Sequence, residues 1–114
     1  MFSGLLAKIS GGGSQLPTIE HDDFARVVND RSCVIVDVRE PNEYAAGHVP
    51  GARNLPLSRF EPSQLPKGNV VIICQAGGRS AKALTQALQA GRNDVRHYQP
   101  GTGGWRARGG AVTA

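Results

Sequence analysis

The most constraining feature of the sequence is an unbroken apolar run at residues 70–73 that ends in Cys74. Four β-branched residues in succession, bounded by turn residues, predict a strand that is buried on both faces. A short loop follows, and then a helical pattern over residues 81–88 that Gly91 ends. The sequence therefore places a cysteine at the carboxyl end of a buried strand, where open α/β sheets hold their ligands and reactive groups.

The loop after Cys74 has the composition of an anion-binding turn. Its residues are Gln75, Ala76, Gly77, Gly78, Arg79 and Ser80. Backbone N–H groups in the first turn of a helix have no internal partner, and glycines allow several of them to turn toward one centre. The positive end of the helix dipole and the charge of Arg79 add to this effect. We therefore expect the pKa of the Cys74 thiol to be lowered, so that the nucleophilic thiolate forms near neutral pH.

Two common phosphate-binding motifs do not fit the chain. The P-loop motif requires a lysine directly after its last glycine, and Arg79 follows Gly78 instead. The glycines within residues 101–104 come after the last predicted strand, and no βαβ unit follows them, so they do not form a dinucleotide-binding motif.

Length and composition indicate a single domain, because 114 residues leave no room for a second core. We expect the domain to span residues 15–114 and residues 1–14 to be a flexible leader. Residues 10–14 read Ser-Gly-Gly-Gly-Ser, a linker that is either natural or introduced. The net charge of +4 is spread over scattered basic residues and aromatic residues are few, so no nucleic-acid surface is predicted. No apolar run is long enough to span a bilayer.

The two cysteines are predicted to lie too far apart for a disulfide bond. Cys33 begins the apolar run at residues 33–36, whereas Cys74 ends its own run. If the two strands are parallel neighbours, the sulfurs lie at opposite ends, roughly 15 Å apart at the usual rise per residue. Free thiols favour a reducing compartment such as the cytoplasm. Two cysteines so placed make no metal-ligand cluster.

A charged residue interrupts the second apolar run, at residues 34–38. An ionised Asp37 in such a strand must be paired or hydrogen-bonded, and Arg39 and Arg53 are the candidate partners. We expect this group to brace loops beneath the cysteine rather than to take part in chemistry. Trp105 is expected to be a packing anchor, and His48 is expected to have a structural role because an activated cysteine needs no general base.

The rest of the chain alternates between strand and helix patterns. Short strands are predicted at 17–20, 52–55 and 95–98, helices at 22–29 and 42–46, helical turns within 57–65, and a glycine-rich turn at 101–105. Together with the two buried strands, this order predicts an α/β fold with a five-stranded parallel sheet, helices on both faces and right-handed crossovers.

Four motifs together resemble a known family, the single-domain rhodaneses, which are sulfurtransferases. The motifs are residues 37–44, 47–54, 74–80 and 101–105, and they follow the expected order across residues 17–110. The resemblance implies a rhodanese fold and transfer of a sulfane sulfur from a donor such as thiosulfate to cyanide, a thiol or a protein. It implies a persulfide on Cys74 and no metal or organic cofactor. In this reading the loop N–H groups hold the persulfide, and Arg79 binds the anionic donor and holds the loop.

Two other functions stay open. A non-turnover sulfur carrier or regulatory module has the same motifs, and the sequence does not separate it from an enzyme. The loop also resembles that of cysteine phosphatases and arsenate reductases, but four residues separate Cys74 from Arg79, one fewer than in that loop. The smaller loop favours a single sulfur over a tetrahedral oxyanion. Some bacterial proteins with a similar domain continue into a hydrophobic tail, which would tether a longer form of the chain to a membrane.

Overall fold

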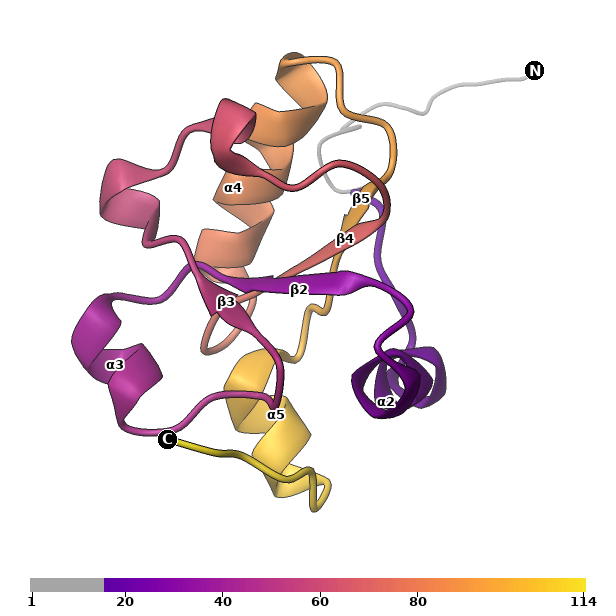
Figure 1. Cartoon of the computed structure of the whole chain (residues 1–114), viewed down its shortest axis with the longest axis vertical. Coiled ribbons are helices and arrows are strands. Elements are labelled where there is room, and N and C mark those ends of the chain that lie inside the picture. The colour runs from indigo at the N-terminus through magenta and orange to yellow at the C-terminus, as the bar shows by residue number, and fades with distance from the viewer. Residues whose placement is uncertain (1–15) are drawn as a thin grey trace.

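The chain folds around a parallel sheet with the strand order β3-β2-β4-β5 (Figure 1). The computed structural model describes residues 16–114, so the predicted leader at 1–14 lies outside the described residues. The strands are β2 (Val34–Asp37), β3 (Arg53–Asn54), β4 (Val70–Ile73) and β5 (Val95–His97). Strand β4 lies between β2 and β5, and all four of its residues are buried, as the unbroken apolar run predicts.

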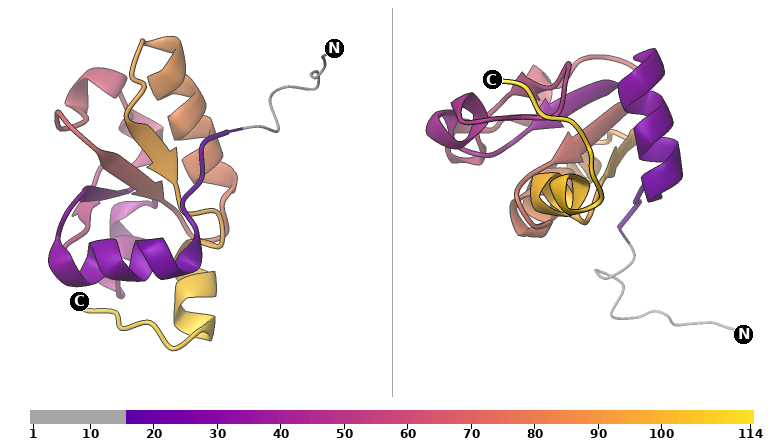
Figure 2. Two further views of the ribbon diagram at one scale, coloured as in Figure 1. Left: turned by 90° about the vertical axis from the view of Figure 1, so that its right-hand side faces the viewer. Right: turned by 90° about the horizontal axis from the view of Figure 1, so that it is seen from below.

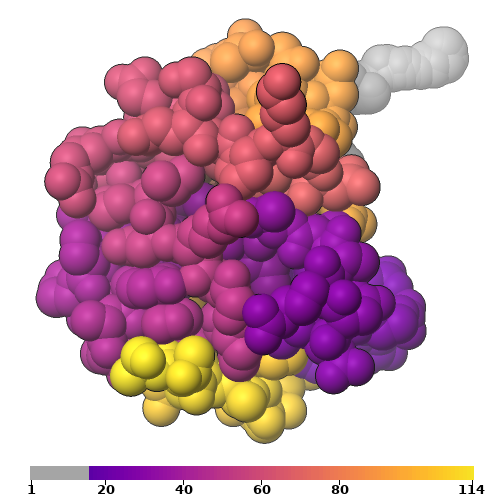
Figure 3. Space-filling model, viewed as in Figure 1, coloured from indigo at the N-terminus to yellow at the C-terminus, as the bar shows by residue number. Residues whose placement is uncertain are grey.

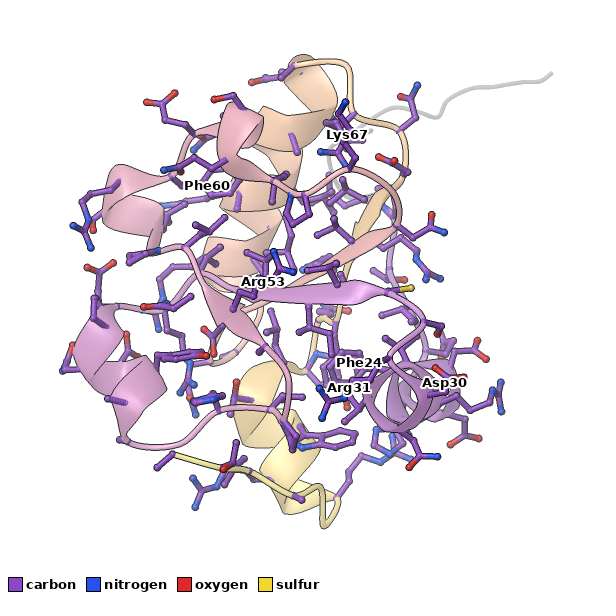
Figure 4. The ribbon with its side chains drawn as sticks, in the orientation of Figure 1. Phe24, Asp30, Arg31, Arg53, Phe60 and Lys67 are labelled. Carbon is purple, nitrogen blue, oxygen red and sulfur yellow. The ribbon has the colours of Figure 1, made fainter. Side chains whose placement is uncertain are left out.

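Helices cover both faces of the sheet, as predicted. They are α2 (His21–Asp30), α3 (Pro41–Ala45), α4 (Gly78–Gln89) and α5 (Gly101–Ala107), with short 3₁₀ helices at Leu57–Arg59 and Pro62–Gln64. Helix α4 and the 3₁₀ helices lie on the upper face in Figure 1, and α2 and α5 lie below, which the turned views of Figure 2 confirm. Each face has its own buried cluster, with Phe60 in the upper one and Phe24 in the lower one (Figure 4).

The expectation of a fifth strand at residues 17–20 is wrong for the part of the chain that the structure describes. That segment makes only a single parallel bridge, between Thr18 and His97, in which the Ile19 N–H donates to the His97 carbonyl at 3.2 Å. The physical reason is local. Pro17 has no N–H to donate, and α2 already begins at His21, so the pairing cannot extend in either direction.

The expected glycine-rich turn at residues 101–105 is instead the start of α5. Glycine is a poor helix former, but here the first N–H groups of the helix find acceptors in the loop after β4. The Thr102 N–H donates to the Cys74 carbonyl at 2.8 Å, and the Gly103 N–H donates to the Gln75 carbonyl at 3.0 Å. Trp105 on this helix is buried and packs edge-on against Phe24.

The register of the sheet places the two cysteines at opposite ends. Val34 pairs with Val70 and Asp37 with Ile73, so β2 and β4 run side by side in the same direction. Cys33 lies just before the first residue of β2, and Cys74 lies just after the last residue of β4. Both thiols are free. Among residues 16–114, no helix combines the length and the apolar character that crossing a bilayer requires.

The end of the chain packs back against the segment after α3. The His48 N–H donates to the Thr113 carbonyl at 2.8 Å, and the C-terminal segment, yellow in Figure 3, lies along the lower edge of this face. The His48 ring stacks on Tyr44, and its Nδ1 lies 2.9 Å from the Tyr44 carbonyl oxygen. These contacts agree with the structural role expected of His48.

Asp37 and Arg39 form a buried ion pair at the carboxyl end of β2. The Arg39 guanidinium donates to Asp37 Oδ2 at 2.8 Å and to Asp37 Oδ1 at 3.1 Å, and also to the Gly47 carbonyl at 2.8 Å. Arg53 is exposed, so of the two candidate partners Arg39 is correct and Arg53 is wrong. The pair ties the end of the strand to the segment after α3, because one guanidinium bridges both.

We predict that Arg39→Met lowers the free energy of unfolding by about 3–5 kcal/mol, since it leaves Asp37 buried without its counter-charge. Arg53→Met is the matched control and should change stability by less than about 0.5 kcal/mol, because that side chain is exposed. Urea denaturation of the two variants measures the difference. Equal, small losses would show that the buried pair contributes little.

Candidate active site

Cys74 lies at the junction of β4 and α4 and is nearly inaccessible, with 1% of its surface exposed. The Gly77 N–H points at its sulfur, 3.1 Å from Sγ. Gly77 has a left-handed backbone, with φ of 97°, and a Cβ there would meet the Gln99 carbonyl oxygen at 2.5 Å. Only glycine therefore allows the loop to turn its N–H toward the sulfur at this point.

The surroundings of Cys74 lower the pKa of its thiol, as the sequence predicts. Burial opposes ionisation, but hydrogen bonding by the Ser80 hydroxyl and by the N–H groups of Ser80, Ala76 and Gly77 outweighs it. These donors come from one turn of main chain plus a single hydroxyl. The site therefore favours a sulfur that carries negative charge.

Ser80 links the sulfur to a buried histidine. Its Oγ lies 3.5 Å from Cys74 Sγ, 3.1 Å from the Gly77 carbonyl oxygen and 2.8 Å from His97 Nδ1. Sequence reasoning gave His97 no role. The signal that could have revealed it is the register of β4 and β5, in which His97 pairs with Ile72. Ile72 and Cys74 are two residues apart and therefore lie on the same face of the sheet, so all three side chains face α4.

Arg79 is held by an ion pair across the loop. Its guanidinium donates to both carboxylate oxygens of Glu43 on α3, at 2.6 and 3.0 Å. Hydrogen bonding from Arg79 is the main reason that the pKa of Glu43 falls to about 2. The pair ties α4 to α3, which is consistent with the loop-holding part of the role expected of Arg79. Donor binding by Arg79 stays a prediction.

A shallow depression of about 440 Å³ opens over the cysteine. Its lining residues are Cys74, Gln75, Ala76, Gly78, Arg79 and Lys82. The other two predicted loop residues, Gly77 and Ser80, contact the sulfur from the buried side. Lys82 was missed, although it lies three residues after Arg79 and so shares its helix face.

The residues predicted to support the loop differ in their relation to it. Arg39 reaches the loop directly, since its Nη1 lies 3.4 Å from Gln75 Oε1. Asp37 acts through Arg39. Trp105 lies on the helix whose first turn meets the loop, and it packs there with Phe24. Within residues 16–114, no three His, Cys, Asp or Glu side chains gather as a metal site would require.

The fold and the loop define a class of α/β proteins that carry a reactive cysteine between a central parallel strand and a helix. The family model described as a rhodanese-like domain matches residues 20–108. The chain belongs to this family.

Curated relatives agree with this assignment. The chain is 42% identical over 95 residues to an uncharacterized protein of Synechocystis sp., covering 81% of this chain and 53% of that protein. It is 34% identical to thiosulfate sulfurtransferase 16 of Arabidopsis thaliana, covering 65% of this chain and 74% of that protein. A putative sulfur carrier protein of Bacillus subtilis is 33% identical, with 87% of this chain and 56% of that protein covered. The chain thus spans about half the length of two of these relatives.

Solved structures share the fold. A rhodanese-related protein from Thermoplasma volcanium has a TM-score of 0.75 at 28% identity, covering 85% of this chain and 97% of that one. A human single-domain sulfurtransferase has a TM-score of 0.70 at 27% identity, covering 81% and 96%. A protein from Rhodopseudomonas palustris described as of unknown function and a possible tyrosine phosphatase has a TM-score of 0.77 at 26% identity, covering 90% and 89%.

Gly101 allows α5 to approach the cysteine loop closely. Its φ is 71°, and a Cβ there would overlap the Gln75 carbonyl oxygen and lie 2.7 Å from the Cys74 carbonyl oxygen. Gly91 also has a left-handed backbone, with φ of 92°, but a Cβ there would meet nothing within 4 Å. An alanine at either position would be strained by the left-handed backbone, but only an alanine at position 101 would also overlap other atoms, so comparing the two substitutions isolates the effect of the overlap.

We predict that Gly101→Ala lowers the free energy of unfolding by roughly 1–3 kcal/mol more than Gly91→Ala, because only the former adds an overlap to the strain of a left-handed alanine. Chemical denaturation of both variants tests this. Equal losses would show that α5 moves away from the loop at no cost.

Proposed function

We propose that this chain is a sulfurtransferase that takes a sulfane sulfur onto Cys74 and passes it to a thiophilic acceptor. The donor class is thiosulfate or a persulfide, and the acceptor is cyanide, a thiol or a protein. The observation that carries the proposal is the ring of hydrogen-bond donors around a buried sulfur whose pKa is lowered. Such a site stabilises a sulfur anion before and after transfer.

The first half-reaction forms a persulfide. The Cys74 thiolate attacks the sulfane sulfur of thiosulfate, a new S–S bond forms, and the old S–S bond breaks as sulfite leaves with the electron pair. The negative charge now sits on the outer sulfur, over the depression that Ala76, Gly78 and Lys82 help to line. Loop N–H groups and the lysine ammonium are the groups available to stabilise it.

The second half-reaction releases the sulfur. A nucleophile such as cyanide attacks the outer sulfur, the S–S bond to Cys74 breaks, and its electron pair returns to Sγ as thiolate. No metal ion or organic cofactor is needed to balance either half. The two free thiols favour a reducing compartment such as the cytoplasm as the place of action.

A sulfur carrier that loads once without turnover is the second candidate. The name of the Bacillus subtilis relative, a putative sulfur carrier protein, favours it, whereas the name of the Arabidopsis relative favours thiosulfate sulfurtransfer. The two functions share the persulfide and differ in release. Multiple turnovers with cyanide support the enzyme, and a single stoichiometric loading supports the carrier.

Phosphatase chemistry has weaker support, although one structural neighbour is described as a possible tyrosine phosphatase. Protonating an alkoxide leaving group requires a general acid near the cysteine. The described residues that line the depression include no carboxylate, and Glu43 is held by Arg79 and ionised down to a pH of about 2.

We predict that the intact protein gains one sulfur atom after incubation with thiosulfate, as measured by mass spectrometry, and that Cys74→Ser gains none. Cys33→Ser is the matched control and should load normally, because Cys33 lies at the opposite end of the sheet. Loading of Cys74→Ser, or no loading of the wild-type chain by any sulfane donor, would contradict the proposed function.

We predict that Lys82→Ala raises the KM for thiosulfate by about tenfold. Arg79 and Lys82 are the two cations that line the depression over the cysteine, and Glu43 already neutralises Arg79, so the Lys82 ammonium is left to bind the anionic donor. An uncharged organic trisulfide should be used as well by this variant as by the wild type. Lys67→Ala, on a loop outside this depression (Figure 4), is the control and should leave both donors unaffected. An equal loss with charged and uncharged donors would exclude a charge-based role.

A further inference from the structure

The least explained group near the reactive sulfur is His97. It is 4% exposed, it lies on β5, and its backbone is held on both sides, by β4 and by the segment at residues 17–19. The main-chain donors around Cys74 do not involve it. Among the residues that the structure describes, hydrogen bonds link it to the sulfur through Ser80, whose Oγ lies 2.8 Å from His97 Nδ1.

The Ser80 hydroxyl has a single hydrogen and three polar neighbours. When Cys74 is a neutral thiol, its S–H donates to Ser80 Oγ, and the hydroxyl donates to the Gly77 carbonyl oxygen, 3.1 Å away. When Cys74 is a thiolate, Sγ only accepts, so the hydroxyl hydrogen must turn to the sulfur. The Gly77 carbonyl keeps a donor in that state, because the Ala81 N–H also reaches it at 3.1 Å.

Turning the hydroxyl toward the sulfur leaves Ser80 Oγ as an acceptor inside the protein. Of its three polar neighbours, only His97 Nδ1 carries a hydrogen that can reach it, and only in the tautomer protonated at Nδ1. We propose that His97 is a positioning residue that donates from Nδ1 to Ser80 Oγ, so that Ser80 donates to Cys74 Sγ whenever that sulfur carries the negative charge. The result is a chain of two hydrogen bonds in one direction, in which each bond strengthens the other.

The surroundings of the histidine keep it neutral in this role. Burial lowers the pKa of His97. The ring borders a second depression of about 450 Å³, on the other side of the loop, whose other lining residues, at positions 16, 18, 76–78, 81 and 99, carry no charge. From α4 it faces Ser80 and Ala81, and from β4 it pairs with Ile72, so the titratable group nearest along this network is Cys74 itself.

This part of the inference rests on the proposed sulfur transfer. Its consequence is an effect of His97 on the rate of the second half-reaction. In the persulfide the charge lies on the outer sulfur, and Ser80 is free to donate to the Gly77 carbonyl. As an acceptor attacks the outer sulfur, the S–S bond breaks and the electron pair goes to Sγ. The Ser80 hydrogen then turns to Sγ and the His97 hydrogen supports it, with no proton transferred. His97 therefore makes Cys74 a better leaving group.

The first test measures the pKa of Cys74 without any sulfur donor, from the pH dependence of iodoacetamide alkylation in a Cys33→Ser background. His97→Leu should raise this pKa by about one unit, because Ser80 loses its supporting donor. His97→Asn should restore it to within a few tenths of a unit, since an amide N–H replaces Nδ1–H. Ser80→Ala should raise it at least as much, and adding His97→Leu to Ser80→Ala should raise it no further.

His21→Leu is the matched control. This histidine lies on the other face of the sheet, where its Nδ1 lies 2.8 Å from the Tyr98 hydroxyl oxygen, so its loss should leave the Cys74 pKa unchanged. An unchanged pKa in His97→Leu, with a raised pKa in Ser80→Ala, would show that Ser80 acts alone and would overturn the proposal.

A second measurement needs no variant at His97. Nitrogen-15 chemical shifts of the imidazole report its tautomer in the Cys33→Ser protein, and above the pKa of Cys74 we expect the hydrogen on Nδ1. A hydrogen on Nε2 in the thiolate state would overturn the proposal even if His97→Leu fails to fold.

Transfer kinetics separate this proposal from the proposed function. With preloaded persulfide, His97→Leu should release sulfur to cyanide several-fold more slowly than the wild type. A protein that never takes up sulfur but shows the expected pKa changes would refute the proposed function and leave the hydrogen-bond chain in place. Normal transfer with an unchanged pKa in His97→Leu would refute the hydrogen-bond chain alone.

Discussion

A nearly inaccessible cysteine whose surroundings lower the pKa of its thiol is the constraint on which most of this structure depends. Burial of the Cys74 thiol opposes its ionisation, and main-chain N–H groups together with one hydroxyl reverse the balance. Such donors work only when the loop cannot relax away from the sulfur. The elements around the loop therefore matter for chemistry as well as for stability, because they hold the donors in place.

The loop is held from three sides. Helix α5 places its first N–H groups on the carbonyls of Cys74 and Gln75, and Gly77 packs against the Gln99 carbonyl. On the third side the ion pair between Arg79 and Glu43 joins α4 to α3. Both carboxylate oxygens of Glu43 accept from the loop arginine, Arg79. This arrangement divides the work: the ion pair of Arg79 with Glu43 holds the loop, and main-chain amides together with the Ser80 hydroxyl face the sulfur.

The local parts of this architecture could be predicted from the chain alone. The apolar run of β4, the glycine-bearing loop and the following helix depend on neighbours in sequence, and they lie where the residue pattern predicts. The helix at Gly101–Ala107 could not be predicted in this way, because glycines disfavour helix and the compensating carbonyls come from residues distant in the chain. The strand expected at 17–20 was wrong because local residue types favoured a strand, whereas the folded chain offers this segment only a single bridge, between Thr18 and His97.

The sequence by itself determined the position of the candidate nucleophile Cys74, the length of the loop after it and the family motifs around it, because these are set by residue types at short spacing. Only the tertiary structure decided which arginine neutralises Asp37, that Glu43 holds Arg79, and that His97 stands behind Ser80. The last two of these contacts join side chains from separate elements, whereas Asp37 and Arg39 lie two residues apart at the end of β2. In all three, the partner depends on the direction in which the folded backbone points each side chain, and that direction exists only once the sheet and its covering helices have packed.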